Sequence, residues 1–244
     1  MPSPYRLGLL LCDQERAHLT ERFYGFREMF ERAFNAHAPG LRWQIYDATR
    51  GELPPVAACD GYLISGSRHS AYEPLPWIAA LADFVRALAD AARPTVGLCF
   101  GHQVIAHALG GEVRRAPQGW GLGVCDYETV EATDWMTPPL PRFSVPVCHQ
   151  DQVTALPTGA RRLASSAHCA NFVVEFTPRL LGLQAHPEVE PAFLEAIIDL
   201  RADSLPPELY ARARRSLARP HDSEALKRWI LTFLGAPLAP PVTA

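Results

Sequence analysis

The sequence predicts an α/β protein with a mostly parallel central sheet covered by helices on both faces. Over residues 5–109, short apolar segments of strand length alternate with longer amphipathic segments of helix length. Connections of this kind place helices on both faces of a parallel sheet. The 244 residues are 48% hydrophobic and 20% charged, which is typical of a folded chain with a sizeable core and not of a disordered one.

The first half of the chain carries the expected strand and helix alternation. An apolar run begins at Tyr5, and a helical spacing of phenylalanines runs from Phe23 to Phe34. Pro94 blocks the continuation of one helix, and Gly110-Gly111 caps the next. In chain order we expect strands at 5–12, 42–46, 60–65 and 95–98, and helices at 20–35, 77–92 and 101–109.

The second half has a different pattern, with several short β-rich segments and little helix before residue 185. We expect antiparallel extensions of the sheet here, with segments at 123–130, 143–148, 171–176 and 180–184. Closing helices are expected at 191–201 and 222–234, the second with Asp222 or Ser223 as its N-cap. The sequence has neither an internal repeat nor a linker segment. Residues 1–235 are therefore expected to form one domain, and residues 236–244 an irregular tail.

Charge and composition exclude several functions. The chain has 23 basic and 26 acidic residues and a net charge of −3, which does not favour a nucleic-acid or membrane partner. Its one lysine, Lys227, rules out a phosphate-binding P-loop. The apolar run at 7–11 is too short for a signal peptide or a membrane span. Six cysteines without a C-x-x-C pair are typical of reduced thiols, so a cytoplasmic location is expected.

The most informative stretch runs from Val96 to Gln103 and contains G-x-C-x-G between a predicted strand and a predicted helix. This is the thiol form of a nucleophile elbow, a sharp turn that needs small residues such as Gly97 and Gly101 on either side of its apex. Cys99 would stand at the apex and at a helix N-terminus, which favours the nucleophilic thiolate. The Phe100 N–H would face an oxyanion. An inert core thiol is the alternative interpretation of the same residues.

A second motif lies at the end of the last predicted strand, in Leu183–Glu188. His186 is suited to act as a base, and Glu188, two residues further and held by the rigid Pro187, is suited to orient the imidazole and stabilise its cation. Together with Cys99 these residues predict a Cys-His-Glu triad in the order nucleophile, base and orienting carboxylate.

The combination of G-x-C-x-G-x-Q and Q-x-H-P-E resembles the class I, triad-type glutamine amidotransferases. The loop 64–67 is similar to the oxyanion loop of that family, and 148–153 to its S-H-x-D-x-V segment, with Cys148 where the family commonly has serine. The resemblance runs from about residue 61 to 188. It implies a three-layer, flavodoxin-like fold with a mostly parallel central sheet and antiparallel extensions.

The resemblance also implies a chemistry. Cys99 would attack the carboxamide of glutamine, His186 would carry the proton and Glu188 would support His186. Stabilisation of the oxyanion is implied for Gly66, Ser67 and Phe100, and substrate binding for Gln103, His149 and Gln150. No cofactor is implied.

Three readings of the function follow. The segment 66–78 resembles a stand-alone, GMP-synthase-like branch of the family, which implies a glutaminase that releases ammonia. Because only 56 residues follow Glu188, a synthetase that uses this ammonia would be a separate subunit. The branch also includes γ-glutamyl peptidases, and both activities pass through the same γ-glutamyl thioester. The third alternative is not an enzyme: the chain would be a non-catalytic binding or regulatory module.

Metal binding is a further alternative, and the sequence does not favour it. The candidate ligands are His102, His107, His149, His168 and Cys169. His102 and His107 are five residues apart, which places them on different faces of a helix, and adjacent His168 and Cys169 have no partner at ligand spacing. We therefore expect no metal. Three tryptophans, Trp77, Trp120 and Trp135, are candidates for lining the cleft.

Overall fold

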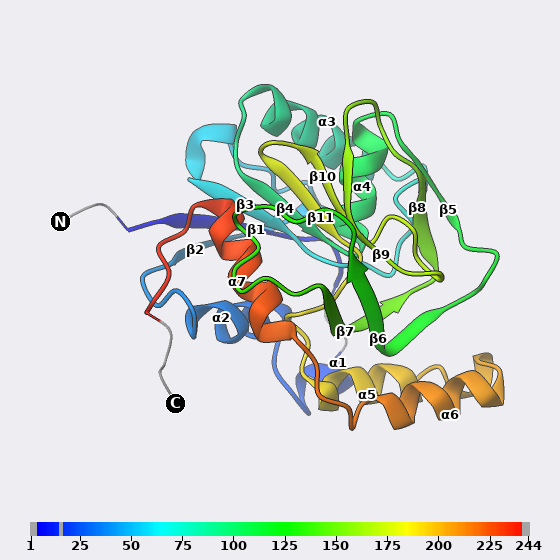
Figure 1. The fold of residues 1–244 in the computed structure, drawn as a ribbon. Coiled ribbons are helices and arrows are strands. Elements are labelled where there is room, and N and C mark those ends of the chain that lie inside the picture. The colour runs from blue at the N-terminus through cyan, green and yellow to red at the C-terminus, as the bar shows by residue number, and fades with distance from the viewer. Residues whose placement is uncertain (1–3, 15–16, 241–244) are drawn as a thin grey trace.

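A computed structural model describes residues 4–14 and 17–240. Its centre is a nine-stranded sheet in the order β2-β1-β3-β4-β11-β10-β9-β6-β7, and β5 and β8 form a small second sheet (Figure 1). The strands from β2 to β11 in this order are parallel, and the remaining four continue the sheet in antiparallel fashion. The strand bounds are β1 Arg6–Leu11, β2 Arg42–Asp47, β3 Gly61–Ile64, β4 Thr95–Leu98, β5 Glu112–Arg115, β6 Gly121–Thr129, β7 Arg142–His149, β8 Asp151–Ala155, β9 Arg161–Ser165, β10 Val173–Thr177 and β11 Leu180–Leu183.

Helices cover both faces of the sheet. Figure 1 shows α3 and α4 on one face and α2 and α7 on the other, with α5 and α6 beside the antiparallel end. Each face has its own apolar cluster, one around Phe30 and Trp229 and the other around Leu81 and Phe100. The helix bounds are α1 Ala17–Thr20, α2 Phe26–Asn35, α3 Pro76–Asp90, α4 Phe100–Ala108, α5 Pro191–Asp199, α6 Pro207–Ser216 and α7 Ser223–Leu234.

This architecture confirms the predicted α/β class, in which a large, mostly parallel central sheet is extended by antiparallel strands. Three local predictions differ from the structure. The helix expected at 20–35 is interrupted, because Gly25 has an extended backbone and α2 begins only at Phe26. The segment 180–184 forms β11, which pairs in parallel with β4 and is antiparallel only to β10. Asp222 precedes α7 without capping it, since its carboxylate accepts the Ser144 N–H at 2.7 Å instead.

The C-terminal tail has no helix or strand over 236–240, and residues 241–244 of the expected tail lie outside the described residues. Ala236 is buried, and the Ala239 N–H donates to the His37 carbonyl at 2.7 Å.

None of the helices in the described ranges has the length and apolar character needed to cross a membrane. All six cysteines are free thiols, as the sequence predicts.

The strand register brings three chain segments to one edge of the sheet. Ile64 at the end of β3 pairs with Gly97, and Leu98 at the end of β4 pairs with Leu183 of β11. The residues that follow β3, β4 and β11 therefore emerge side by side at the carboxyl ends of parallel strands, where open α/β sheets bind ligands.

Candidate active site

Cys99 lies at the turn between β4 and α4, the apex of the predicted elbow. Its backbone has φ 51° and ψ −102°, a conformation that residues other than glycine seldom adopt. The Cys99 N–H donates to the Leu183 carbonyl at 2.8 Å, which ties the apex to β11. The residue is 5% exposed, and its Sγ lies 3.9 Å from the Cys148 carbonyl oxygen. The turn thus holds the thiol in a fixed place at the sheet edge.

The two glycines of the elbow are required by close backbone contacts. A Cβ on Gly97 would lie 2.3 Å from the carbonyl carbon and oxygen of Gly101. A Cβ on Gly101 would lie 2.3 Å from the Ile64 carbonyl oxygen. Side chains at these positions would collide with backbone atoms, which cannot move aside as a flexible side chain can. The expected crowding at this turn is confirmed.

His186, which is partly buried, and Glu188, which is buried, form a pair shortly after β11. His186 Nδ1 lies 2.8 Å from Glu188 Oε1, and the Glu188 side chain is 2% exposed. The His186 N–H donates to the Pro146 carbonyl at 2.9 Å, which anchors the segment to β7. Burial disfavours the imidazolium, but the adjacent Cys99 and Glu188 more than offset burial and raise the pKa of His186 well above its usual range.

Gly66, in the loop after β3, closes the space between the thiol and the imidazole. A Cβ at this position would lie 2.7 Å from His186 Cε1 and 3.7 Å from Cys99 Cβ. Ser65 Oγ fixes this loop, because it accepts the Cys12 N–H at 2.9 Å and donates to the Gly66 carbonyl at 3.0 Å. The structure therefore brings the loop, the nucleophile candidate and the base candidate together.

Phe100 and Ser67, the other two residues expected to stabilise the oxyanion, lie near the Cys99 turn. Phe100 is the first residue of α4, and N–H groups in the first turn of a helix have no acceptor within the helix. Ser67 borders the cleft, and its Oγ accepts the His69 N–H at 3.1 Å. Phe100 thus follows Cys99 directly in the chain, and Gly66 and Ser67 lie in the loop beside it.

A polar cavity of about 250 Å³ opens from Cys99 and contains all three residues expected to bind substrate, Gln103, His149 and Gln150. The Gln103 amide donates to the Asp151 carbonyl at 2.8 Å and to Gln184 Oε1 at 3.1 Å, so it is held rigidly. Burial, followed by the charge of His168, lowers the pKa of His149 to about 3. His149 is therefore a neutral polar group at this wall.

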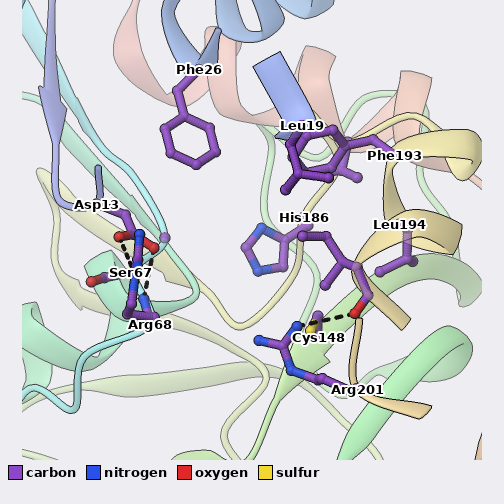
Figure 2. A pocket seen from close by; sticks show the side chains of 13 residues that line it. Asp13, Leu19, Phe26, Ser67, Arg68, Cys148, His186, Phe193, Leu194 and Arg201 are labelled. Atoms are coloured by element: carbon purple, nitrogen blue, oxygen red, sulfur yellow. Dashed lines mark hydrogen bonds and ion pairs between the residues drawn. The ribbon is translucent and has the colours of Figure 1, made fainter. Parts of the chain in front are cut away.

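A second hollow opens on the other side of the cleft, where His186 forms part of its wall (Figure 2). It shares a border of four residues with the polar cavity: Ser67, Arg68, Cys148 and Arg201. The Arg68 side chain is held by Asp13, whose Oδ1 accepts Nε–H at 2.7 Å. No sequence motif marks either arginine as a site residue: Arg201 simply follows α5, and Arg68 is distinguished only by its place in the loop after Gly66.

Of the remaining candidates, Trp120 lies at the cleft, while His102 and Trp135 pack against buried aromatic rings. His102 is fully buried, its ring packs against Phe176, and burial lowers its pKa to about 3. Within residues 4–14 and 17–240, no group of three His, Cys, Asp or Glu side chains is arranged to hold a metal ion. Trp120 lines the polar cavity beneath Arg201, while Trp135 packs against Trp229 in the core.

The chain is similar in sequence to known proteins. The family model for glutamine amidotransferase class-I matches residues 30–196. The chain is 31% identical to gamma-glutamyl peptidase 5 of Arabidopsis thaliana over 204 residues, which cover 80% of each chain. It is 35% identical to a GMP synthase (glutamine-hydrolyzing) of Thermomicrobium roseum over 143 residues, which cover 57% of this chain and 25% of that one.

The fold has solved counterparts as well. A glutamine amidotransferase from Thermotoga maritima superposes with a TM-score of 0.72 and 21% identity, over 95% of this chain and 96% of that one. The sequence match covers more than half of the chain and extends through the elbow and the His186 segment. The chain belongs to the class-I glutamine amidotransferase family.

Proposed function

We propose that the protein hydrolyses the amide bond of γ-glutamyl compounds through a thioester on Cys99. The observation that carries this proposal is the meeting of three segments at one sheet edge. There the strained Cys99 turn, the His186–Glu188 pair and the Gly66 loop surround one point. A thiol, a base oriented by a carboxylate and free helix N–H groups are the parts that acyl transfer needs.

The reaction proceeds in two steps. His186 takes the proton of the Cys99 thiol, the sulfur attacks the γ-carbonyl carbon, and the oxyanion that forms is stabilised by N–H groups at Gly66 and Phe100. The C–N bond then breaks while His186 gives a proton to the departing nitrogen, which leaves a glutamyl thioester. In the second step His186 takes a proton from water, the water oxygen attacks the thioester, the C–S bond breaks and glutamate leaves. Glu188 supports the imidazolium in both steps.

The first candidate substrate is glutamine, whose departing group is ammonia. Family membership and the similarity to the glutamine-hydrolyzing GMP synthase support it. In this case we propose that a separate synthetase subunit accepts the ammonia. The six free cysteines are consistent with a reducing compartment, and we propose the cytoplasm.

The second candidate is a γ-glutamyl peptide, whose departing group is an amino acid or peptide amine. The similarity to gamma-glutamyl peptidases over 80% of the chain supports this candidate. The hollow beside His186 supports it as well, because ammonia needs no such space.

The test is glutamate release from glutamine and from a panel of γ-glutamyl peptides, with ammonia measured in parallel. We expect Cys99→Ala to abolish release, while Cys125→Ala, which removes a half-buried thiol away from the site, leaves release intact. Glutamate and ammonia in equal amounts from glutamine would identify a glutaminase, and peptide turnover with little ammonia would identify a peptidase. No release from any substrate, together with a Cys99 thiol that γ-glutamyl-like alkylating agents do not modify, would point to the non-catalytic module.

A further inference from the structure

Cys99 and His186, the proposed nucleophile and base, line different cavities. Cys99 borders the polar cavity and not the second hollow, whereas His186 borders the second hollow and not the polar cavity. In the proposed reaction the acyl carbon binds to Cys99, and His186 gives its proton to the departing nitrogen. A substrate in this reaction would have its scissile amide at the shared border, with the glutamyl part towards the polar cavity and the departing group towards the hollow beside His186.

The hollow beside His186 has an apolar wall. Its six apolar residues come from the α1–α2 region and from α5 and the turn before it; they are Leu19, Phe26, Val189, Phe193, Leu194 and Ile197. Figure 2 shows Phe26, Leu19 and Phe193 around the His186 ring. The hollow measures about 120 Å³. An enclosed apolar cavity of roughly 150 Å³ holds a benzene ring, and this hollow, which is not enclosed and continues into the polar cavity, suits one apolar side chain of about that size.

Arg201 stands at the border between the two cavities. Its Nη1 donates to the Ile197 carbonyl at 3.1 Å, and its guanidinium lies over the Trp120 ring at 5.3 Å from the ring centroid. These contacts fix the side chain, and no Asp or Glu of the described ranges forms an ion pair with it. Arg68, on the same border, is already paired with Asp13. Arg201 is thus a positioned cation that is able to receive a carboxylate in fork geometry.

Resting on the proposed function, we infer that the hollow beside His186 is the subsite for the departing residue of a γ-glutamyl dipeptide. The departing residue is an apolar amino acid such as leucine or phenylalanine, with its side chain against Phe26 and Ile197 and its α-carboxylate on Arg201. Glutamine places only an NH₂ group at the edge of this hollow and leaves the apolar wall unused.

The first experiment compares kcat/KM for γ-glutamyl-leucine, γ-glutamyl-phenylalanine, γ-glutamyl-glycine and glutamine, with Cys99→Ala as the blank. We expect the two apolar dipeptides to exceed γ-glutamyl-glycine and glutamine by about tenfold or more, since an apolar pocket discriminates by roughly this factor for even small changes in a side chain. Equal values across the panel would overturn the subsite and leave the hydrolase intact. A lack of Cys99-dependent release from every substrate would instead refute the proposed function.

Two variants test whether the apolar wall determines the preference for apolar departing residues. Ile197→Asn introduces a polar group at a half-buried wall position and is expected to lower the leucine-to-glycine ratio of kcat/KM at least fivefold. Leu200→Asn makes the same kind of change in the adjacent turn, at a side chain that is 48% exposed and outside the hollow, and is expected to keep the ratio. A ratio that Ile197→Asn leaves unchanged would overturn the assignment of this wall.

The carboxylate contact has its own test. The comparison substrate is γ-glutamyl-isopentylamide, whose departing amine has the leucine side chain but no carboxylate. We expect the native protein to prefer γ-glutamyl-leucine and Arg201→Gln to lose this preference. If Arg201→Gln weakens both substrates equally, Arg201 serves the glutamyl half, and the carboxylate assignment is wrong.

Discussion

His186 Nδ1 lies 2.8 Å from Glu188 Oε1 across a single proline, so the proposed base and the proposed orienting carboxylate belong to one short turn after β11. Because Nδ1 is hydrogen-bonded to Glu188, Nε2 is the ring nitrogen that is available to exchange a proton with Cys99. The second carboxylate oxygen, Oε2, is buried and has no hydrogen-bond partner in the described part of the chain. The carboxylate therefore acts through this one contact.

Glu188→Gln tests that contact. The substitution keeps the size of the side chain and removes its charge, so the imidazolium that forms in each chemical step loses its stabilising partner. We expect kcat to fall by about 10²–10⁴-fold while the fold is kept, because making the carboxylate of a Ser-His-Asp triad neutral lowers kcat by about 10⁴-fold. The measurement is steady-state hydrolysis beside circular dichroism, with Glu224→Gln, at an exposed ion pair with His37, as the matched control. A loss of less than threefold would exclude Glu188 from the triad.

The buried histidines predict acid sensitivity. Burial lowers the pKa of His102 to about 3, whereas an unfolded histidine titrates near 6.5. Between these values the unfolded chain binds the proton and the folded chain does not, so stability falls as pH drops from 6.5 towards 3. At pH 5 this one group costs about 2 kcal/mol relative to pH 7. Urea unfolding at both pH values is expected to show a smaller pH 7-to-5 difference for His102→Gln than for the native chain, and no such change for His107→Gln at an exposed position.

The sequence indicated the local parts of the candidate site but not those that depend on tertiary packing. Cys99 with its two glycines, and His186 with Glu188, are each encoded within a few residues, and the backbone contacts of Gly97 and Gly101 follow from the turn itself. Arg201 reaches the cleft only because α5 packs beside the antiparallel strands. No spacing in the sequence reports such a contact.

The same distinction explains the fold. The strand at β4 was predictable from its apolar run, but β5 and β8 pair across about 40 residues, with Val113 opposite Val153, and neither strand was expected. The parallel pairing of β11 with β4 likewise depends on which neighbour the sheet offers, as in Leu181 opposite Val96. Local periodicity identifies strands, and long-range pairing decides their direction.

Gly97→Ala tests the elbow as a structural requirement. The new methyl group would lie 2.3 Å from the backbone of Gly101 and 2.6 Å from the His102 nitrogen, and β4 cannot shift without breaking its register with β3 and β11. We expect a loss of about 1–3 kcal/mol or more in the free energy of unfolding, as overpacked cores show. Chemical denaturation measures it, with Gly40→Ala as the control because a Cβ there meets nothing within 4 Å. Native-like stability of Gly97→Ala would show that the turn is looser than its contacts indicate.

Gly66→Ala is expected to separate activity from stability. Its methyl group would lie 2.7 Å from His186 Cε1, and the nearest backbone is not in its way, so the fold is retained while the imidazole is pushed from its place. The ring cannot move freely, because Glu188 holds Nδ1. A displacement of about 1 Å costs roughly 10²-fold in rate when reacting groups must be aligned. We therefore expect kcat to drop by about that factor with a melting temperature close to that of the native chain and of Gly40→Ala. Full activity in Gly66→Ala would mean that His186 does not work in the position that the structure gives it, and the two-step reaction would need another base.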